Sequence, residues 1–351
     1  MQGTREIRIG AGHVLRTTTV YDTYWQFAAK RQDLFMRRVA GAPAPWTDDR
    51  VLGSYRFTNV YRAADRVSQY LIRHVLYDGL QTEQELFFRA ILFKIFNRIE
   101  TWKRLTSEVG PLSWKEFDFE RYAQTLDDML VRGEAIYSGA YIMPSPPFGS
   151  RRKHRNHLRL LEDMMHSGAP WRIARARSLR EMFEVLRGYP SLGDFLAFQF
   201  TIDLNYSELT HFSEMEFVVA GPGARDGIRK CFAATDGLSD CEIIRIMADR
   251  AQLECEQQGL SFQTLWGREL QLIDCQNLFC EVDKYSRVVH PMIRARSGRT
   301  HIKQKFVQKP DPVPQWYPPK WKVKVPAALS EPRAELHMPT QRILRFGSTD
   351  T

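Results

Sequence analysis

The chain has 351 residues, of which 43% are hydrophobic and 12% aromatic, so it can bury a substantial core and is not expected to be disordered as a whole. No apolar run is long enough for a membrane-spanning helix, and the first residues lack the apolar segment of a secretory signal. The five cysteines form no C-x-x-C pair, which argues against a disulfide framework or a zinc ribbon. These features favour an intracellular protein, cytoplasmic or, in a eukaryote, nuclear.

Positive charge is concentrated in two parts of the chain. The 50 Lys+Arg and 41 Asp+Glu residues give a net charge of +9. Residues 286–325 hold ten basic residues and one acid, so the rest of the chain is neutral as a whole. Within that rest, residues 151–180 hold nine basic residues and two acids. Two basic patches suit a polyanion partner such as DNA, although two solvated surfaces would have the same composition.

Apolar residues recur at helical spacing through most of the chain, so we predict a multi-helix, all-α fold. Sequences of the form S/T-x-x-E, starting at Thr82, Ser113, Ser178 and Ser239, are typical of capping boxes and indicate four helix starts. One strand-like segment lies at 135–143 and is equally compatible with an extended connection. The expected helices cover residues 20–39, 58–76, 86–105, 192–204, 240–258 and 267–285, with another after the Gly-Pro-Gly at 221–223.

Helical periodicity stops after residue 290. Prolines and lysines then alternate with Trp316, Tyr317 and Trp321, which indicates an extended tail that wraps the domain or orders on binding. The lysines at 320, 322 and 324 are expected to contact phosphate. The predicted organisation is an N-terminal arm (1–18), a helical domain (19–290) with lobes 19–150 and 151–290, and a basic Pro-rich tail (291–351).

Several motifs of common enzyme classes are missing. The sequence has no G-x-x-x-x-G-K-[ST], no G-x-G-x-x-G after a strand, no H-E-x-x-H and no G-x-S-x-G. We therefore expect no P-loop kinase chemistry, no Rossmann cofactor site and no zinc-protease or hydrolase centre. His154 and His157 lie among arginines, which predicts a solvated basic helix and no metal site.

The first polar constellation is R-F-T-N-V-Y-R-A-A-D-R at 56–66. Thr58 and Asn59 are suited to cap a helix, and Asn59 and Arg62 would then share one face with Arg66. Free amides at the helix start, together with Arg62, would bind a phosphate. The alternative is a capped surface helix in which Arg62 pairs with Asp65.

Two further constellations combine carboxylates with amides or lysine. Asp203 and Asn205 close an apolar helix and are followed by Glu214 and Glu216. They are either caps and turn formers or the polar floor of an apolar pocket, where a buried carboxylate has a raised pKa and can act as acid or base. The second forms a polar stripe on the helix at 270–287, which favours either a site or a hydrogen-bond network between helices. Its members are Asp274, Asn277, Glu281 and Lys284.

The fourth constellation is Gly-Pro-Gly-Ala-Arg at 221–225. Glycines beside a proline let backbone approach a ligand closely, and the amides of the following helix would then point at it. Arg225 and Arg229 add positive charge. A helix–hairpin–helix binds a DNA phosphate in this way, although Gly-Pro-Gly is also an ordinary turn.

Five segments together resemble one family in order and spacing: RFTNVYRAADR, FFRAILFKIFNRIETW, DFLAFQFTIDLNY, EFVVAGPGAR and LIDCQNLFCEVDKY. It is the 5-hydroxymethyluracil-DNA-kinase helical domain family, also described as the alpha-glutamyl/putrescinyl-thymine pyrophosphorylase clade, and the resemblance covers about residues 15–290. It implies a two-lobed core similar to helix–hairpin–helix DNA glycosylases. It also implies thymine hypermodification, in which an amino acid or amine replaces pyrophosphate on a pyrophosphorylated 5-hydroxymethyluracil base in double-stranded DNA.

The resemblance also implies roles for individual residues. The target base would be flipped into a pocket between the lobes, and Mg²⁺ can accompany pyrophosphate. A separate P-loop kinase and a thymine hydroxylase would be partners, and no membrane is involved. The expected catalytic residues are Asn59, Arg62, Asp203, Asn205, Glu216 and Asp283, with Asp203, Glu216 or Asp283 taking the proton from the amine. The expected DNA- and phosphate-binding residues are Arg56, Lys94, Gly221, Gly223, Ala224, Arg225 and Lys284.

Two other functions use the same fold. One is a glycosylase or lesion reader, whose catalytic Asp would follow the hairpin, where the sequence offers Asp236 and Asp240. The other is a non-catalytic subunit that presents DNA to a separate kinase.

Overall fold

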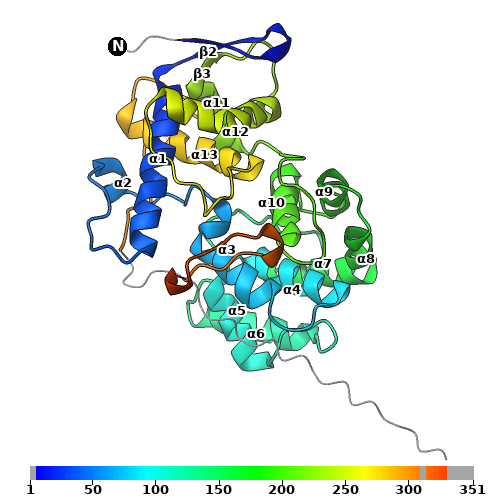
Figure 1. Ribbon diagram of the computed structural model, residues 1–351. Helices are drawn as coiled ribbons and strands as arrows, with labels where there is room; N and C mark the ends of the chain where they lie inside the picture. Colours follow the sequence, from blue (N-terminus) through cyan, green and yellow to red (C-terminus); the bar gives the residue numbers. More distant parts are fainter. Residues whose placement is uncertain (1–4, 309–313, 330–351) are drawn as a thin grey trace, which may run out of the picture.

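α-Helices make up most of the computed structural model, which describes residues 5–308 and 314–329 (Figure 1). The expectation of a mainly helical protein is therefore confirmed. The helices are α1 (Thr19–Val39), α2 (Arg50–Ser54), α3 (Arg66–Leu71), α4 (Glu83–Phe96), α5 (Ile99–Val109), α6 (Phe119–Val131), α7 (Lys153–His166), α8 (Ala169–Ala174), α9 (Leu179–Arg187), α10 (Asp194–Asn205), α11 (Pro222–Cys231), α12 (Asp240–Gln257) and α13 (Leu272–Val289).

The N-terminal arm forms a small antiparallel sheet, which the sequence patterns do not predict. Strands β1 (Glu6–Arg8) and β2 (Val14–Thr17) pair with each other, and β2 also pairs with β3 (Phe232–Ala234). Each strand has only three or four residues, too few for an alternating pattern to stand out. The strand-like segment at 135–143 forms no strand, so it is a connection.

Helix starts follow the capping signals in most places. Ser178 caps α9, and Ser239 caps α12 in a complete capping box with Glu242. Thr82 caps α4, but the Glu85 carboxylate turns away and accepts the amides of residues 114 and 115. Ser113 accepts the amide of residue 116 in a turn, and the next helix starts only after Asp118.

Two expected helices differ from the structure. The helix at 86–105 is interrupted at Asn97, whose φ of 48° lies in the left-handed region and ends α4. The helix at 58–76 does not start at Thr58. Residues 56–61 are non-helical, a single 3₁₀ turn covers Arg62–Ala64, and α3 starts at Arg66. The predicted start is wrong because side-chain carboxylates bind these amides: the distant Glu281 accepts from residue 58, and the nearby Asp65 accepts from residue 59.

The helices pack in two groups that do not follow the order of the chain. The upper group in Figure 1 contains α1 with α11, α12, α13 and the small sheet. The lower group contains α3 to α10. The expected lobe boundary near residue 150 falls inside the lower group, between α6 and α7, which pack on each other.

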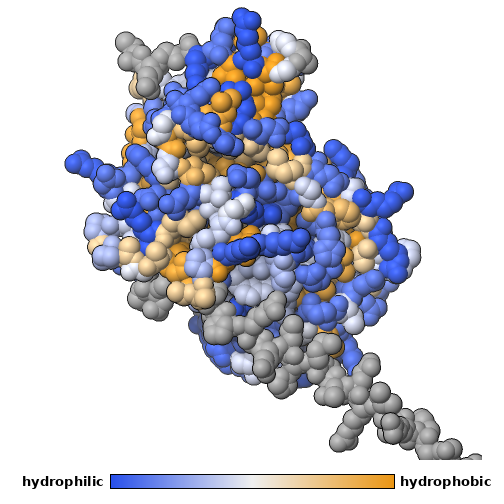
Figure 2. Space-filling model, in the orientation of Figure 1, coloured by the Kyte–Doolittle hydropathy of each residue, from blue (hydrophilic) through white to orange (hydrophobic). Residues whose placement is uncertain are grey.

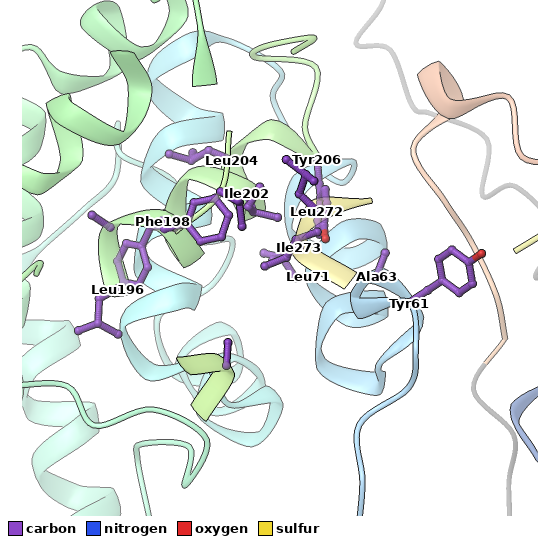
Figure 3. Close-up of a cluster of buried hydrophobic side chains, with 14 of the residues drawn as sticks. Tyr61, Ala63, Leu71, Leu196, Phe198, Ile202, Leu204, Tyr206, Leu272 and Ile273 are labelled. Carbon is purple, nitrogen blue, oxygen red and sulfur yellow. The ribbon is translucent and has the colours of Figure 1, made fainter. Parts of the chain in front are cut away.

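A continuous apolar core joins the two groups. Side chains from α10, α3 and the start of α13 meet in the close-up of Figure 3. Its labelled members include Leu71, Phe198, Ile202, Leu204, Tyr206, Leu272 and Ile273. The outer face in Figure 2 is mainly hydrophilic, with smaller apolar patches between the polar side chains. Among the described residues, no helix has the length and apolar character required to cross a bilayer.

The described parts of the tail lie against the helical domain. Residues 304–306 bond to residues 54–56, with an isolated bridge between Tyr55 and Lys305. Further along, Gln315 and Tyr317 are buried, and the Lys320 ammonium donates to the carbonyls of three residues that follow or end α10. The tail is thus extended and wraps the domain where it is described; residues 309–313 and 330–351 lie outside the described residues.

Candidate functional site

The centre of the candidate site is a buried carboxylate with two cations. Asp203 Oδ1 lies 2.5 Å from Arg62 Nη1, and its Oδ2 lies 2.6 Å from Lys94 Nζ. Arg62 comes from the 3₁₀ turn, Lys94 from α4 and Asp203 from α10. All three side chains are at most 5% exposed. Both helices are apolar around most of their circumference, so the fold buries these charges and they must compensate one another.

Hydrogen bonds extend this cluster on the Arg62 side. The Arg62 guanidinium donates through Nε to Gln199 Oε1 at 3.2 Å and through Nη1 to the Tyr206 hydroxyl at 3.2 Å. Tyr141 donates its hydroxyl to the same Gln199 oxygen at 3.2 Å. Gln199 Nε2 then reaches Gln276 Oε1 on α13 at 3.5 Å. The network therefore connects both groups of helices.

The charge balance of the cluster is positive. Burial alone would raise the pKa of Asp203, but the nearby Arg62 and Lys94 outweigh it, so that pKa lies below its ordinary value. Asp203 therefore stays ionised and neutralises one of the two cations. Among Arg62, Lys94 and Asp203 one positive charge therefore remains, and it is uncompensated while the nearby Asp274 carboxyl, with a pKa of about 7, is protonated. A buried positive charge of this kind suits an anionic ligand such as a phosphate.

Asp274 joins this cluster through the backbone. Its Oδ1 accepts the Arg62 backbone amide at 2.8 Å, and its Oδ2 accepts the amide of Gln271 at 3.0 Å. Burial, together with the negative charge of Glu214, raises the pKa of Asp274 to about 7. Asp274 thus fixes the 3₁₀ turn that presents Arg62. This part of the polar stripe belongs to a hydrogen-bond network between elements.

Two half-buried aromatic side chains lie at the edge of the cluster. The Lys94 ammonium lies 4.3 Å from the ring centre of Tyr141, and this ring lies 5.9 Å from that of Phe195. Phe195 in turn lies against Gly221, where a Cβ would be only 2.8 Å from the Phe195 ring. The start of α11 is therefore a neighbour of the edge of the Arg62–Lys94–Asp203 cluster.

The Gly-Pro-Gly-Ala-Arg segment forms the first turn of α11, with Gly221 as N-cap. Two glycines of α11 allow close packing on α13. A Cβ at Gly223 would lie 3.0 Å from Cys280 Sγ, and one at Gly227 only 2.1 Å from the carbonyl oxygen of Phe279. Gly221 and Ala224 are buried, and Arg225 is exposed, with Nε 3.7 Å from Asp240. The binding of DNA by this segment stays a prediction. Arg225 is the exposed side chain of the segment that could contact a phosphate.

The segment before α11 is not a helix. α10 ends at Asn205, and residues 206–221 are irregular, so no helix leads directly into the Gly-Pro-Gly turn. The carboxylates expected for a glycosylase also lie elsewhere. Asp240 is at the start of α12 beside Arg225, and Asp236 accepts the amide of residue 14.

Asn59 belongs to a separate polar group. Its amide nitrogen Nδ2 donates to the Ala64 carbonyl at 2.7 Å, and its oxygen accepts from Arg31. Burial raises the pKa of the neighbouring Asp65 to about 6, even though Arg31 stabilises its charge. The expected helical face shared by Asn59, Arg62 and Arg66 is therefore wrong, because the backbone between them is not an α-helix.

Arg56 and Lys284 lie next to each other at the surface near the tail. The Lys284 ammonium lies 2.6 Å from Glu281 Oε2 and 3.4 Å from the carbonyl oxygen of Arg56. The Arg56 side chain is exposed, and its backbone amide donates to residue 304 of the tail.

Asp283 is held in another buried cluster. Lys230 Nζ lies 2.9 Å from its Oδ1, donates to its carbonyl at 3.0 Å and to the hydroxyl of Ser286 at 3.1 Å, while Arg287 binds Oδ2. Asp283 follows Asp274 by nine residues on α13, a rise of about 13 Å. The structure therefore does not bring Asp283 into the Arg62 cluster, and its contacts join α11 to α13.

Neither Asn205 nor Glu216 contacts the Arg62–Lys94–Asp203 cluster through its side chain in the contacts of the described residues. Asn205 donates to the carbonyl of Phe212 and accepts from Thr210 and the Phe212 amide, so its side chain organises the loop after α10. Glu216 is exposed. Its neighbour Glu214 is the buried carboxylate, 2.7 Å from Arg268. The turn-former alternative therefore describes the Asn205 side chain.

Part of the basic run at 151–180 is paired with acids, some on other helices and some close by in the sequence. Arg152, His154 and Arg155 all pair with Asp127 of α6. Further along, Arg159, Arg175 and Arg177 pair with glutamates. The described residues contain no group of three or more His, Cys, Asp and Glu side chains arranged to hold a metal ion.

Sequence reasoning missed Gln199, Gln276 and Tyr141 as members of the cluster. Gln199 carries a signal that could have found it, because it is an amide in the middle of the apolar helix α10. Lys94 has the same signal in α4. Tyr141 lies in a connection with no helical periodicity, so only the tertiary structure places it beside Lys94.

Comparison with known proteins gives one family. Residues 18–295 match the family model described as "5-hmdU DNA kinase, helical domain". The chain is also 28% identical over 287 residues to a 5-hmdU DNA kinase of Bacillus phage SP10. That match covers 76% of this chain and 45% of the relative, so the chain spans less than half of the relative's length. No solved structure matches. Because the family model covers most of the chain, the protein belongs to the family of the 5-hmdU DNA kinase helical domain.

Proposed function

We propose that this protein modifies 5-hydroxymethyluracil in DNA, by transferring an amino acid or amine onto the pyrophosphorylated base and releasing pyrophosphate. The single observation that carries the proposal is the pairing of two buried cations, Arg62 and Lys94, with one carboxylate, Asp203. The family match and the name of the phage relative support 5-hydroxymethyluracil in DNA as the target. DNA is then the partner, and a separate kinase and a thymine hydroxylase would supply the substrate.

The proposed reaction is a substitution at the methylene carbon on C5 of the base. A bond forms between the amine nitrogen and this carbon, and the bond from the carbon to the pyrophosphate oxygen breaks. The electron pair leaves with pyrophosphate, and the proton lost by the amine passes to the departing pyrophosphate. No redox reagent is needed for this balance.

The residues of the cluster then have distinct tasks. Arg62 and Lys94 stabilise the charge that develops on the leaving pyrophosphate, which is worth most in a buried environment. Asp203 holds both cations in place. It is a weak base because the two cations lower its pKa, so we assign it a positioning role and not proton abstraction. The base would enter past Tyr141 and Phe195, the half-buried side chains at the edge of the cluster.

The test uses the purified protein with duplex DNA that carries 5-hydroxymethyluracil, either plain or pyrophosphorylated, together with candidate amines. Digested bases are then analysed by mass spectrometry. A base adduct that requires pyrophosphorylation is expected. An abasic site would instead identify a glycosylase, and binding without any product would identify a DNA-presenting subunit.

A further inference from the structure

An exposed aliphatic side chain stands beside the edge of the candidate site. Ile142 is 89% exposed, although the residues on both sides of it are held by the fold. Single exposed apolar residues are common on protein surfaces and by themselves mean little. This one is distinguished by its position next to Tyr141, the residue that contacts Lys94.

Tyr141 anchors the loop on the N-terminal side of Ile142. Its hydroxyl donates to Gln199 of the buried network at 3.2 Å, and its ring lies over the Lys94 ammonium. The residue before Ile142 is therefore tied to the buried cluster.

A histidine anchors the loop on the other side. Met143 is 3% exposed, and the carbonyl of Pro144 is 2.9 Å from His157 Nε2. Because this carbonyl can only accept, Nε2 carries the proton. Burial lowers the pKa of His157 to about 4, so the ring is neutral and its Nδ1 accepts from the Tyr137 hydroxyl at 2.7 Å. His157 thus joins both ends of the segment that carries Ile142.

We propose that Ile142 is a wedge that enters the DNA duplex and fills the space left when the target base is flipped towards Lys94. A side chain suited to this task is apolar, projects from the surface and is held rigidly, because a flexible one would lose entropy on insertion. Ile142 is apolar and 89% exposed, and its backbone is held between the anchors at Tyr141 and Pro144. The inference rests on the proposed function, since it takes DNA with a flipped base as the substrate.

Positive charge near this loop suits the adjacent phosphates. Arg151 lies seven residues after Pro144, shortly before α7, and is exposed. The Lys153 ammonium lies 4.5 Å from the ring centre of Tyr137, at the base of the same segment. Cations on the residues that follow the apolar tip along the chain are available to bind phosphates of a duplex.

The experiment compares Ile142→Ala with Val131→Ala, a matched control that also truncates a highly exposed aliphatic residue, at the end of α6. Unstacking is followed by the fluorescence of 2-aminopurine next to 5-hydroxymethyluracil in a duplex, and affinity by anisotropy. Ile142→Ala should reduce the unstacked fraction by about tenfold or more. Val131→Ala should have no effect, and both variants should keep the parent's melting temperature.

A second substrate tests the mechanism. When the target base is already unpaired in a single strand, Ile142→Ala should unstack and process it as the parent does, because no duplex has to be opened. Equal unstacking of the duplex by parent and Ile142→Ala, or an equal loss in the control variant, would overturn the wedge. If the parent unstacks the base but yields no adduct, the proposed transfer fails while the wedge stands.

Discussion

Lys94 Nζ lies 2.6 Å from Asp203 Oδ2, and each side chain is only 3% exposed. Arg62 binds the other oxygen of the same carboxylate. These contacts bring together three residues that lie far apart in the sequence, and two of them are cations. Breaking a buried ion pair by removing one partner costs more than the pair itself contributes, because a charge is left uncompensated. The first predictions follow from this asymmetry.

Replacing Asp203 with Asn should destabilise the protein strongly. Two buried cations would then face each other without a counter-charge, and the expected loss is about 3–5 kcal/mol of unfolding free energy. Chemical denaturation measures it. Glu216→Gln is the matched control, because Glu216 is exposed, and should stay within about 0.5 kcal/mol of the parent. Equal stability of the two variants would show that Asp203 does not hold the cations.

Replacing Arg62 with Lys distinguishes a role of this side chain in the reaction from a role in folding. The variant keeps the charge opposite Asp203 but loses the donors to Gln199 and Tyr206. We expect a folded protein with adduct formation at least about tenfold slower, which is a loss of roughly 1.4 kcal/mol of transition-state stabilisation. Adduct yield per time by mass spectrometry checks this. A variant as fast as the parent would remove Arg62 from the reaction.

Asp274 should make stability fall as the pH rises towards neutrality. Its folded pKa of about 7 lies above the value of a free carboxyl, so the folded state holds the proton more tightly than the unfolded state. The stabilisation that Asp274 adds to the free energy of unfolding is complete below about pH 4. It is lost progressively as the pH rises to about 7. Denaturation of the parent and of Asp274→Asn across this range gives the difference. If the two curves run parallel, Asp274 does not titrate in this way.

Two substitutions in α11 should distinguish a role in helix packing from a role in DNA contact. Gly227→Ala places a Cβ against the Phe279 carbonyl and should cost several kcal/mol, about 3 or more, or prevent folding. Arg225→Ala changes an exposed side chain, so the melting temperature should be unchanged. If Arg225 contacts a phosphate, the slope of log affinity against log salt should fall by about 1. An unchanged slope would exclude that contact.

The tail lysines should fall into two classes. Lys320 donates to three backbone carbonyls at the end of α10, and burial lowers its pKa to about 8. Lys320→Ala should therefore lower the unfolding free energy by about 1–3 kcal/mol. Lys322 and Lys324 are exposed. Their joint replacement with Ala should reduce the salt slope of DNA binding and leave stability unchanged; the reverse pattern would contradict this division.

The Lys320 contacts also correct one expectation from the sequence. Three lysines at alternate positions look equivalent in the sequence, and all three were expected to contact phosphate. The structure turns Lys320 inward, against carbonyls that the end of α10 leaves free. Only the packing of the tail on the domain distinguishes this lysine from its neighbours.

Local signals in the sequence were sufficient for much of the helical fold. Apolar periodicity predicts α1, α10, α12 and α13, and the caps at Ser178 and Ser239 form as expected, because these features depend on residues within one or two helical turns. The tertiary structure decided the rest. Helix α3 starts late because Glu281, from the other end of the chain, binds the amide of residue 58.

For the candidate site, too, the sequence determined one part and the tertiary structure another. The sequence by itself determined that Arg62 and Asp203 are charged residues in or near apolar segments, and for such residues burial requires a partner. It did not determine which partner, since Asp283 has the same local signal but binds Lys230 on α11. Long-range packing selects the partner, because a buried charge is stabilised by whatever opposite charge the fold places within a few ångströms.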